Sequence, residues 1–172
     1  MAEHLQTIIF MVRHGQTDSA YSREAGIDSQ RQLTDTGVQQ SVALGRYLAA
    51  FAPSAIYSSP LDRCIDTAAA IKTEVGLDDK IVITKQLQEI YSSEPRQEAG
   101  ERGESIFQTV LQTHRGEQVV AVTHQYIIGY IVADFLGVGF RDVPCEFADV
   151  YRLVFADKTL VEATRLQPAK AA

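Results

Sequence analysis

The feature that most constrains the fold of this chain is a short apolar run that ends in charged and polar groups. Residues 8–12 are uninterrupted apolar side chains, and Arg13, His14 and Gly15 follow them directly. A brief run rich in Ile and Val that stops at a turn-forming glycine is typical of a buried strand. An arginine and a histidine after such a strand would lie at its carboxyl end, the edge at which open α/β sheets bind ligands.

The remainder of the chain alternates between helix and strand patterns, with two polar stretches among them. Pro53 and Gly76 follow two segments of helical spacing and are typical of helix ends. This order predicts a single-domain three-layer α/β/α sandwich over residues 1–172, with a mostly parallel sheet and an antiparallel edge strand. We expect helices over 38–51, 61–75, 104–112 and 126–136, further strands over 55–57, 81–83 with 85–87, 119–122, 149–155 and 160–166, and polar loops over 17–35 and 91–104.

Composition narrows the classes of protein to which the chain can belong. Its 172 residues are 45% hydrophobic with a formal net charge of -6, which fits one soluble domain without a basic stripe for nucleic acid. Apolar runs fall short of the ~20 residues of a membrane helix, and the N-terminus lacks the features of a signal peptide. Cys64 and Cys145 form neither a disulfide framework nor a metal-type spacing. We therefore expect a cytoplasmic protein with no nucleic-acid or membrane partner.

A second histidine follows a second buried strand in the same way as the first. Thr123 and His124 end the run at 119–122 as Arg13 and His14 end theirs. Because parallel strands end at the same edge of a sheet, both imidazoles are expected to meet there. The segment 58–63 joins another strand to a helix start and brings Arg63 to that edge, where a helix N-terminus favours anions. These residues predict a pocket for a dianion.

The motifs that surround these residues resemble those of the histidine phosphatase superfamily, in the branch of cofactor-dependent phosphoglycerate mutases and fructose-2,6-bisphosphatases. They occur in the family's order and cover nearly the whole chain. The matching segments are Arg13 to Thr17, Leu33-Thr34 with Gly37 and Gln40, Ser58 to Arg63 with Thr67-Ala68, Leu87-Gln88-Glu89, Gly103-Glu104-Ser105, and the strand that ends at His124.

The resemblance implies a role for each site residue. His14 would be the nucleophile that becomes phosphorylated, and Glu89 the proton donor to the leaving oxygen, with Glu94 and Glu98 as alternative donors. Arg13, Arg63 and His124 would bind the phosphoryl group, and Thr17, Gln16 and Gln125 are candidate substrate-binding residues. Thr17 is equally well explained by hydrogen bonds within its own turn.

Elementary chemistry sets the protonation states that these roles need. His14 must present an unprotonated nitrogen, which a hydrogen bond from its other ring N–H to a backbone carbonyl would fix. His124 serves best as an imidazolium beside the phosphate, and Glu89 must be protonated near neutral pH, so burial or the negative charge of the substrate should raise its pKa. Arginines and His124 supply the positive charge, so neither a metal nor another cofactor is expected.

The chain departs from the family pattern in three places. Gln125 stands where the family commonly has glycine, Ser19-Ala20 stand where mutases carry Trp-Asn, and the chain is too short for the mutases' substrate-covering insertion. We therefore expect a metal-independent phosphatase for a small phosphorylated metabolite, with no mutase activity. A phosphohistidine protein phosphatase is an alternative, although the short family members usually carry an acidic residue and alanine in place of Gln16 and Thr17. A catalytically idle phosphate-binding protein is another.

Two further expectations concern the surface. Each of four loop arginines is expected to be solvated rather than bound to substrate, namely Arg23, Arg31, Arg96 and Arg102. The chain is expected to be a monomer or a homodimer, and an apolar edge near the C-terminus is a candidate dimer contact, formed by Phe147, Val150, Tyr151 and Leu153.

Overall fold

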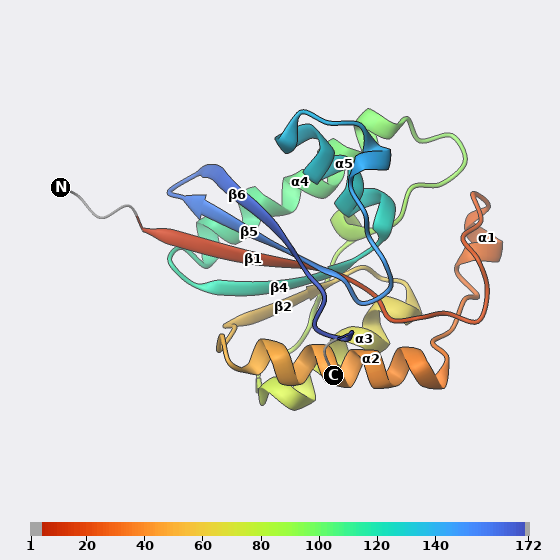
Figure 1. The fold of residues 1–172 in the computed structure, drawn as a ribbon, viewed down its shortest axis with the longest axis horizontal. Coiled ribbons are helices and arrows are strands. Elements are labelled where there is room, and N and C mark those ends of the chain that lie inside the picture. The colour runs from red at the N-terminus through yellow and green to blue at the C-terminus, as the bar shows by residue number, and fades with distance from the viewer. Residues whose placement is uncertain (1–4, 171–172) are drawn as a thin grey trace.

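A six-stranded mixed sheet forms the centre of the protein (Figure 1). The structure is a computed structural model and describes residues 5–170. The strand order is β3-β2-β4-β1-β5-β6, in which the first four strands are parallel, β5 is antiparallel to β1, and β6 is antiparallel to β5. The strands are β1 (Gln6–Arg13), β2 (Ala55–Ser58), β3 (Val82–Ile83), β4 (Gln118–Thr123), β5 (Val150–Ala156) and β6 (Thr159–Leu166).

Helices cover both faces of this sheet, which confirms the predicted three layers. In Figure 1, α2 and α3 lie below the sheet, α4 and α5 lie above it, and the short α1 lies beyond the carboxyl ends of the parallel strands. The helices are α1 (Ala25–Asp28), α2 (Asp35–Ala49), α3 (Asp62–Val75), α4 (Arg96–Thr113) and α5 (Gln125–Leu136), with two 3-10 turns, η1 (Lys85–Leu87) and η2 (Phe140–Asp142).

Burial on both faces of the sheet explains why the sequence of β1 is apolar without alternation. Ile9 and Met11 belong to the core under α4 and α5, whereas Phe10 and Val12 belong to the core under α2 and α3. All four side chains are fully buried. Burial of such a side chain stabilises the fold by about 1.5–3 kcal/mol, so a strand buried on both faces gains from every position.

The turn that follows β1 is fixed by two glycines that touch. A Cβ atom on Gly15 would lie 2.4 Å from the carbonyl oxygen of Gly37, and one on Gly37 would lie 2.2 Å from the carbonyl oxygen of Gln16. Helix α2 begins beside this contact, where the hydroxyl of Thr34 accepts a hydrogen bond from the Gly37 amide. The backbone carrying His14 is thereby held against the start of α2.

Two predicted elements differ from the structure. Helix α4 begins at Arg96, eight residues before the predicted start, because Gly100 and Gly103 are helical: a Cβ on Gly103 would lie 2.6 Å from a side-chain carbon of Ile127 in α5. The predicted loop 91–104 is therefore mostly helix. Residues 85–87 form η1 and not a strand, because the Thr84 hydroxyl accepts from the Gln86 amide and starts a turn.

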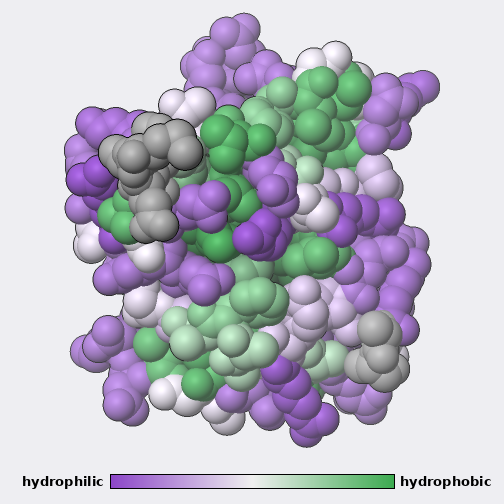
Figure 2. All heavy atoms as spheres, turned by 60° about the vertical axis from the view of Figure 1, so that its left-hand side comes forward, coloured by the Kyte–Doolittle hydropathy of each residue, from purple (hydrophilic) through white to green (hydrophobic). Residues whose placement is uncertain are grey.

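The predicted apolar dimer edge is wrong, because β5 is an inner strand. It lies between β1 and β6, and Val150, Tyr151 and Leu153 are buried within the protein itself. Figure 2 views the side at which β1 begins, and there apolar residues form patches interrupted by hydrophilic ones. Within residues 5–170, no helix is both long and apolar enough to cross a membrane.

Candidate active site

The two histidines lie side by side at the carboxyl ends of adjacent parallel strands. β1 and β4 pair with Arg13 opposite Thr123, so the residues that follow, His14 and His124, leave the sheet at the same level. Their ring centroids are 5.4 Å apart. The expectation that both imidazoles meet at one sheet edge is confirmed.

Arg63 bridges the two rings from the first turn of α3. Its guanidinium is fully buried, and its Nε–H donates to Nε2 of His14 at 3.2 Å. Its Nη2 lies 3.3 Å from Nδ1 of His124. Three junctions between strand and helix thus converge on one buried cluster, as the sequence predicts.

The contacts of His14 define which of its nitrogens carries the proton. A guanidinium can only donate, so Nε2 of His14 accepts from Arg63 and is unprotonated. Nδ1 carries the proton and donates to the carbonyl oxygen of Gly15 at 2.8 Å, as expected from the chemistry. Burial and the charges of Arg63 and Arg13 hold the pKa of His14 well below 6.5. His14 is therefore neutral, and its unprotonated Nε2 carries the lone pair that accepts from Arg63.

His124 has a different set of partners. Its Nε2 lies 2.8 Å from the Ser59 hydroxyl and 3.5 Å from the Cys64 thiol, and its Nδ1 faces Arg63. Burial, followed by the charge of Arg63, lowers the pKa of His124 well below its ordinary value. The protein groups alone keep this ring neutral, so the expected imidazolium requires the negative charge of a phosphate beside it. Burial raises the pKa of Cys64 to about 12, which makes its thiol unreactive.

Arg13 lies at the other side of His14 with one donor unused. Its Nη1 donates to the carbonyl oxygen of Cys145 at 2.7 Å, and its guanidinium carbon lies 4.1 Å from the Phe147 ring centroid. Its Nε is buried and has no acceptor in the described part of the chain. A buried, unpaired donor is costly, and an anion in this pocket would satisfy it.

Glu89 is a buried carboxyl group with the raised pKa that the sequence analysis expects. Only 3% of the residue is exposed, and its Oε1 accepts from the Ile90 amide. Burial raises its pKa to about 7, against the opposing effects of the Ile90 hydrogen bond and of Arg63. The alternative donor Glu94 is engaged by Arg102 through two hydrogen bonds of 2.8 Å, and Glu98 is exposed in the first turn of α4.

Asp28 is a functional candidate that the sequence analysis missed. This fully buried carboxylate accepts hydrogen bonds from Arg63 Nη2 at 2.7 Å, from the Tyr91 hydroxyl at 2.7 Å and from Arg31 Nη1 at 3.1 Å. Burial acts to raise its pKa, but the hydrogen bonds from Tyr91 and from the Ser22 amide, together with Arg63, lower it overall. Asp28 thus stays ionised and holds two arginines in place.

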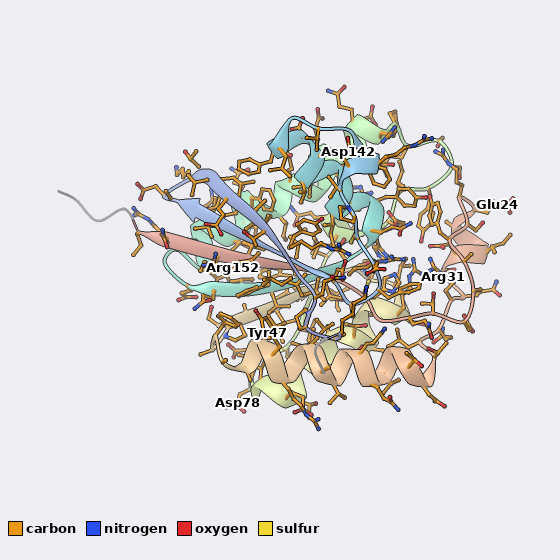
Figure 3. All side chains as sticks on the ribbon, in the orientation of Figure 1. Glu24, Arg31, Tyr47, Asp78, Asp142 and Arg152 are labelled. Atoms are coloured by element: carbon orange, nitrogen blue, oxygen red, sulfur yellow. The ribbon has the colours of Figure 1, made fainter. Side chains whose placement is uncertain are left out.

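The prediction that Arg31 is solvated is wrong, because the residue is only 4% exposed and pairs with Asp28. Figure 3 labels Arg31 where the loop carrying α1 faces the sheet. The pair lies in a polar loop without periodicity, which hid it from the sequence analysis. The three-residue spacing of Asp28 and Arg31 was the one available signal.

The three candidate substrate-binding residues lie beside the cluster, and two of them have protein partners. The Thr17 hydroxyl accepts from Arg31 and donates to the Ser19 carbonyl oxygen. The Gln16 Oε1 accepts from the Thr34 hydroxyl at 2.8 Å. Gln125 is the first residue of α5, directly after His124, and is half-buried. Within residues 5–170, no cluster of three or more His, Cys, Asp or Glu side chains is arranged to hold a metal ion.

Comparison with known proteins gives matches to one family. A family model for the histidine phosphatase superfamily (branch 1) matches residues 9–94 and 91–165. A glucosyl-3-phosphoglycerate phosphatase of Mycolicibacterium vanbaalenii is 42% identical over 69 residues, which make up 40% of this chain and 30% of that protein. The match therefore spans less than a third of that relative.

Solved structures with a similar fold cover nearly the whole chain. The protein histidine phosphatase SixA with tungstate aligns at a TM-score of 0.75 and 17% identity, over 96% of this chain and 99% of that one. A native mycobacterial glucosyl-3-phosphoglycerate phosphatase aligns at a TM-score of 0.74 and 19% identity, over 93% of this chain and 97% of that one. A phosphoserine phosphatase mutant of Entamoeba histolytica with phosphoserine aligns at a TM-score of 0.73 and 15% identity, over 91% of this chain and 96% of that one. At these identities the likeness establishes the fold.

Proposed function

The chain belongs to the histidine phosphatase superfamily, and from this membership we propose that it is a metal-independent phosphatase that hydrolyses phosphomonoesters through a phosphohistidine on His14. The observation that carries the proposal is the state of His14: a neutral imidazole whose Nε2 lone pair lies in a buried cluster with two arginines. Such a nitrogen can attack phosphorus, because no proton must first be removed from it.

In the first half of the proposed reaction, Nε2 of His14 forms a bond to phosphorus while the bond to the ester oxygen breaks. Arg13 and Arg63 neutralise the phosphoryl oxygens, and the unused Nε–H of Arg13 gains an acceptor. The phosphate dianion raises the pKa of His124, whose imidazolium then donates a hydrogen bond to a phosphoryl oxygen. Protonated Glu89 gives its proton to the leaving oxygen.

In the second half, water hydrolyses the phosphohistidine. Glu89, now ionised, accepts a proton from water as the water oxygen attacks phosphorus and the bond to His14 breaks. A pKa of about 7 suits both steps, since the carboxyl group exchanges its proton readily near neutral pH. Inorganic phosphate leaves, and His14 and Glu89 return to their starting states.

The substrate is proposed to be a small phosphorylated metabolite. Named relatives and neighbours in fold include a glucosyl-3-phosphoglycerate phosphatase and a phosphoserine phosphatase. The fold of SixA, a protein histidine phosphatase, covers the chain equally well, which keeps phosphohistidine protein as the second candidate substrate. A cytoplasmic location, a monomeric or homodimeric state and the lack of a cofactor stay predictions.

The test is turnover of p-nitrophenyl phosphate with a chelator present, combined with rapid quenching and mass spectrometry of the protein. We expect release of p-nitrophenol and an added phosphoryl group on the peptide that contains His14. His14→Asn should lose both, whereas the off-site control His114→Asn should retain both. Turnover without phosphorylation of that peptide would contradict the mechanism, and turnover only on phosphohistidine protein would favour the second candidate. No turnover on either substrate would leave the idle phosphate-binding alternative.

A further inference from the structure

A cleft of about 630 Å³ lies outside the proposed phosphate pocket. Its lining comes from the loop before α1, from the start of α4, from α5 and from η2. The residues that matter are three arginines and three aromatic residues: Arg23, Arg96, Arg141, Tyr126, Tyr130 and Phe140. In Figure 3, Glu24, which follows Arg23, and Asp142, which follows Arg141, label two of these segments. We call this surface the arginine cleft.

One lining residue of the arginine cleft, Tyr126, follows the catalytic cluster closely in sequence and is joined to it by side-chain contacts. Tyr126 lies two residues after His124, in the first turn of α5. Its ring centroid is 4.7 Å from that of Tyr21, and the Tyr21 hydroxyl donates to the carbonyl oxygen of Ile90 at 2.6 Å. Ile90 follows Glu89 directly and donates its amide N–H to that carboxyl group. These contacts link Tyr126, a lining residue of the cleft, to the backbone beside Glu89.

Aromatic rings contact Arg96 and restrain its position. The Arg96 guanidinium carbon lies 4.9 Å from the ring centroid of Tyr130 and 5.5 Å from that of Phe140. The Phe140 ring stacks on Tyr126, with centroids 5.3 Å apart and an interplanar angle of 10°. Stacking restrains a guanidinium without occupying the N–H groups at its edge.

Contacts between two loops hold Arg23. The Arg23 side chain donates to the Ser92 carbonyl oxygen at 3.3 Å, and the Ser92 amide donates to the Arg23 carbonyl oxygen at 2.9 Å. These bonds join the segment before α1 to the segment before α4. The backbone that presents Arg23 to the cleft is thus tied down on a second side.

The charge of the arginine cleft is not balanced by the protein. In the described residues, no carboxylate is within ion-pair distance of Arg23, Arg96 or Arg141, whereas Arg63 and Arg102 each have one. Asp142 is the sole carboxylate among the lining residues, against three guanidinium groups. A chain with a net charge of -6 therefore presents a local excess of positive charge next to its phosphate pocket.

We propose that the arginine cleft binds a second anionic group of the substrate, a carboxylate or a further phosphate, joined to the reacting phosphate by a short linker that crosses Tyr126. The substrate class is then a small phosphomonoester with two anionic ends, and the alcohol product keeps the second charge. This inference rests on the proposed phosphatase function and adds the chemistry of its substrate. Arginine forms forked hydrogen bonds with both kinds of anion.

The test compares substrates that differ only in the second charge. The carboxylate arm uses the O-phosphates of hydroxypropanoate and hydroxybutanoate, and the phosphate arm uses propanediol bisphosphate. Propyl and butyl phosphate are the uncharged references. Phosphate release gives kcat/KM for the wild type, for Arg96→Gln and Arg141→Gln, and for Arg46→Gln, a matched control on α2 whose partner is Glu74.

We expect the wild type to prefer at least one of the two charged arms over the alkyl phosphates by about tenfold or more, the value of one hydrogen bond to a charged group. Arg96→Gln and Arg141→Gln should each lower that preference about tenfold, and Arg46→Gln should leave it as in the wild type. Preference confined to one arm identifies the second group as carboxylate or phosphate.

Equal kcat/KM values for charged and alkyl substrates would overturn the inference and leave the phosphatase proposal standing. The same holds if Arg46→Gln lowers the preference as much as the cleft variants do, because the effect would then come from overall charge. No phosphate release from any of these substrates or from p-nitrophenyl phosphate would instead contradict the phosphatase proposal itself.

Discussion

The ends of β1 and β4 occupy equivalent places in the sheet, yet they give two histidines with different surroundings. Each strand is buried, each ends at the same level, and each is followed by an imidazole. At His14 the proton-bearing nitrogen is bound by the backbone of the next residue. At His124 both nitrogens face side chains, those of Ser59 and Arg63. Neighbouring groups therefore decide the chemistry of two rings that the backbone places alike.

This difference suggests that the two rings have different roles in the reaction. The Gly15 carbonyl oxygen holds the proton of His14 on Nδ1, which fixes the tautomer and leaves Nε2 unprotonated for bond formation. Side-chain partners allow His124 to take up a proton once an anion is near. Variants of the two histidines and of their neighbours distinguish these roles.

The largest effect is expected from truncating the two histidines. His14→Ala removes the attacking nitrogen and should lower turnover of p-nitrophenyl phosphate by roughly 10⁴-fold or more. His124→Ala removes one charged donor and should lower it by about 10²–10³-fold. Rapid-quench mass spectrometry should still find slow phosphorylation of the His124→Ala protein. Equal losses with no phosphoprotein in either variant would show that the rings do not divide the work.

The next largest effect concerns Glu89 as the proton donor. Glu89→Gln keeps the shape of the side chain but has no proton to give, so hydrolysis of an alkyl phosphate should fall by about 10²–10⁴-fold. Hydrolysis of p-nitrophenyl phosphate should fall much less, because nitrophenolate leaves without a proton. Rates across a series of leaving groups measure this contrast. Full turnover of the alkyl phosphate by Glu89→Gln would overturn the assignment, and Glu98→Gln is the matched control.

The raised pKa of Glu89 also predicts how the variant changes stability with pH. Folding raises the pKa of this carboxyl group from 4.5 to about 7. Between pH 4.5 and pH 7 the folded protein therefore binds more protons than the unfolded one. The contribution of Glu89 to the unfolding free energy of the wild type is thus at its maximum below pH 4.5 and falls as the pH rises toward 7. Glu89→Gln lacks this loss, so its unfolding free energy relative to wild type should increase by about 2–3 kcal/mol between pH 5 and 8.5. Urea unfolding at the two pH values measures it, and a constant difference would contradict the buried, protonated state.

A smaller effect on activity is expected from Asp28, which contacts the two histidines indirectly, through Arg63. Asp28→Asn leaves the guanidinium groups of Arg63 and Arg31 without their buried counter-charge. The unfolding free energy should fall by about 3 kcal/mol, and kcat/KM by about tenfold. Asp78→Asn, at an exposed position, should change neither. An increase in kcat/KM would show that Asp28 opposes substrate binding rather than orienting Arg63.

The smallest effect is expected from the hydroxyl that contacts His124. Ser59→Ala removes one neutral hydrogen bond of 2.8 Å to Nε2 and should lower kcat/KM about threefold to tenfold. The phosphorylation of His14 should keep its wild-type extent. Ser54→Ala, on the far side of the domain beside His114, is the control. A loss as large as that of His124→Ala would give Ser59 a more direct role.

The sequence alone determined the frame of the site. Runs of apolar residues buried on both faces predict parallel strands, and a polar residue after such a strand can lie only at its carboxyl end. That physical rule placed His14, His124 and Arg63 together before any coordinates. The raised pKa of Glu89 was expected from the acid role that the family resemblance implies.

Only the tertiary structure decided what surrounds that frame. Asp28 and Arg31 reach the cluster from a loop whose path depends on contacts distant in sequence, such as the Gly15–Gly37 contact and the Tyr91 hydrogen bond. The tautomer of His14 follows from the hydrogen bond that the Arg63 guanidinium donates to Nε2, a contact that only the structure shows. Local patterns encode strands and their ends because these depend on neighbouring residues. Loop positions and protonation states depend on groups brought together by packing, which no local pattern records.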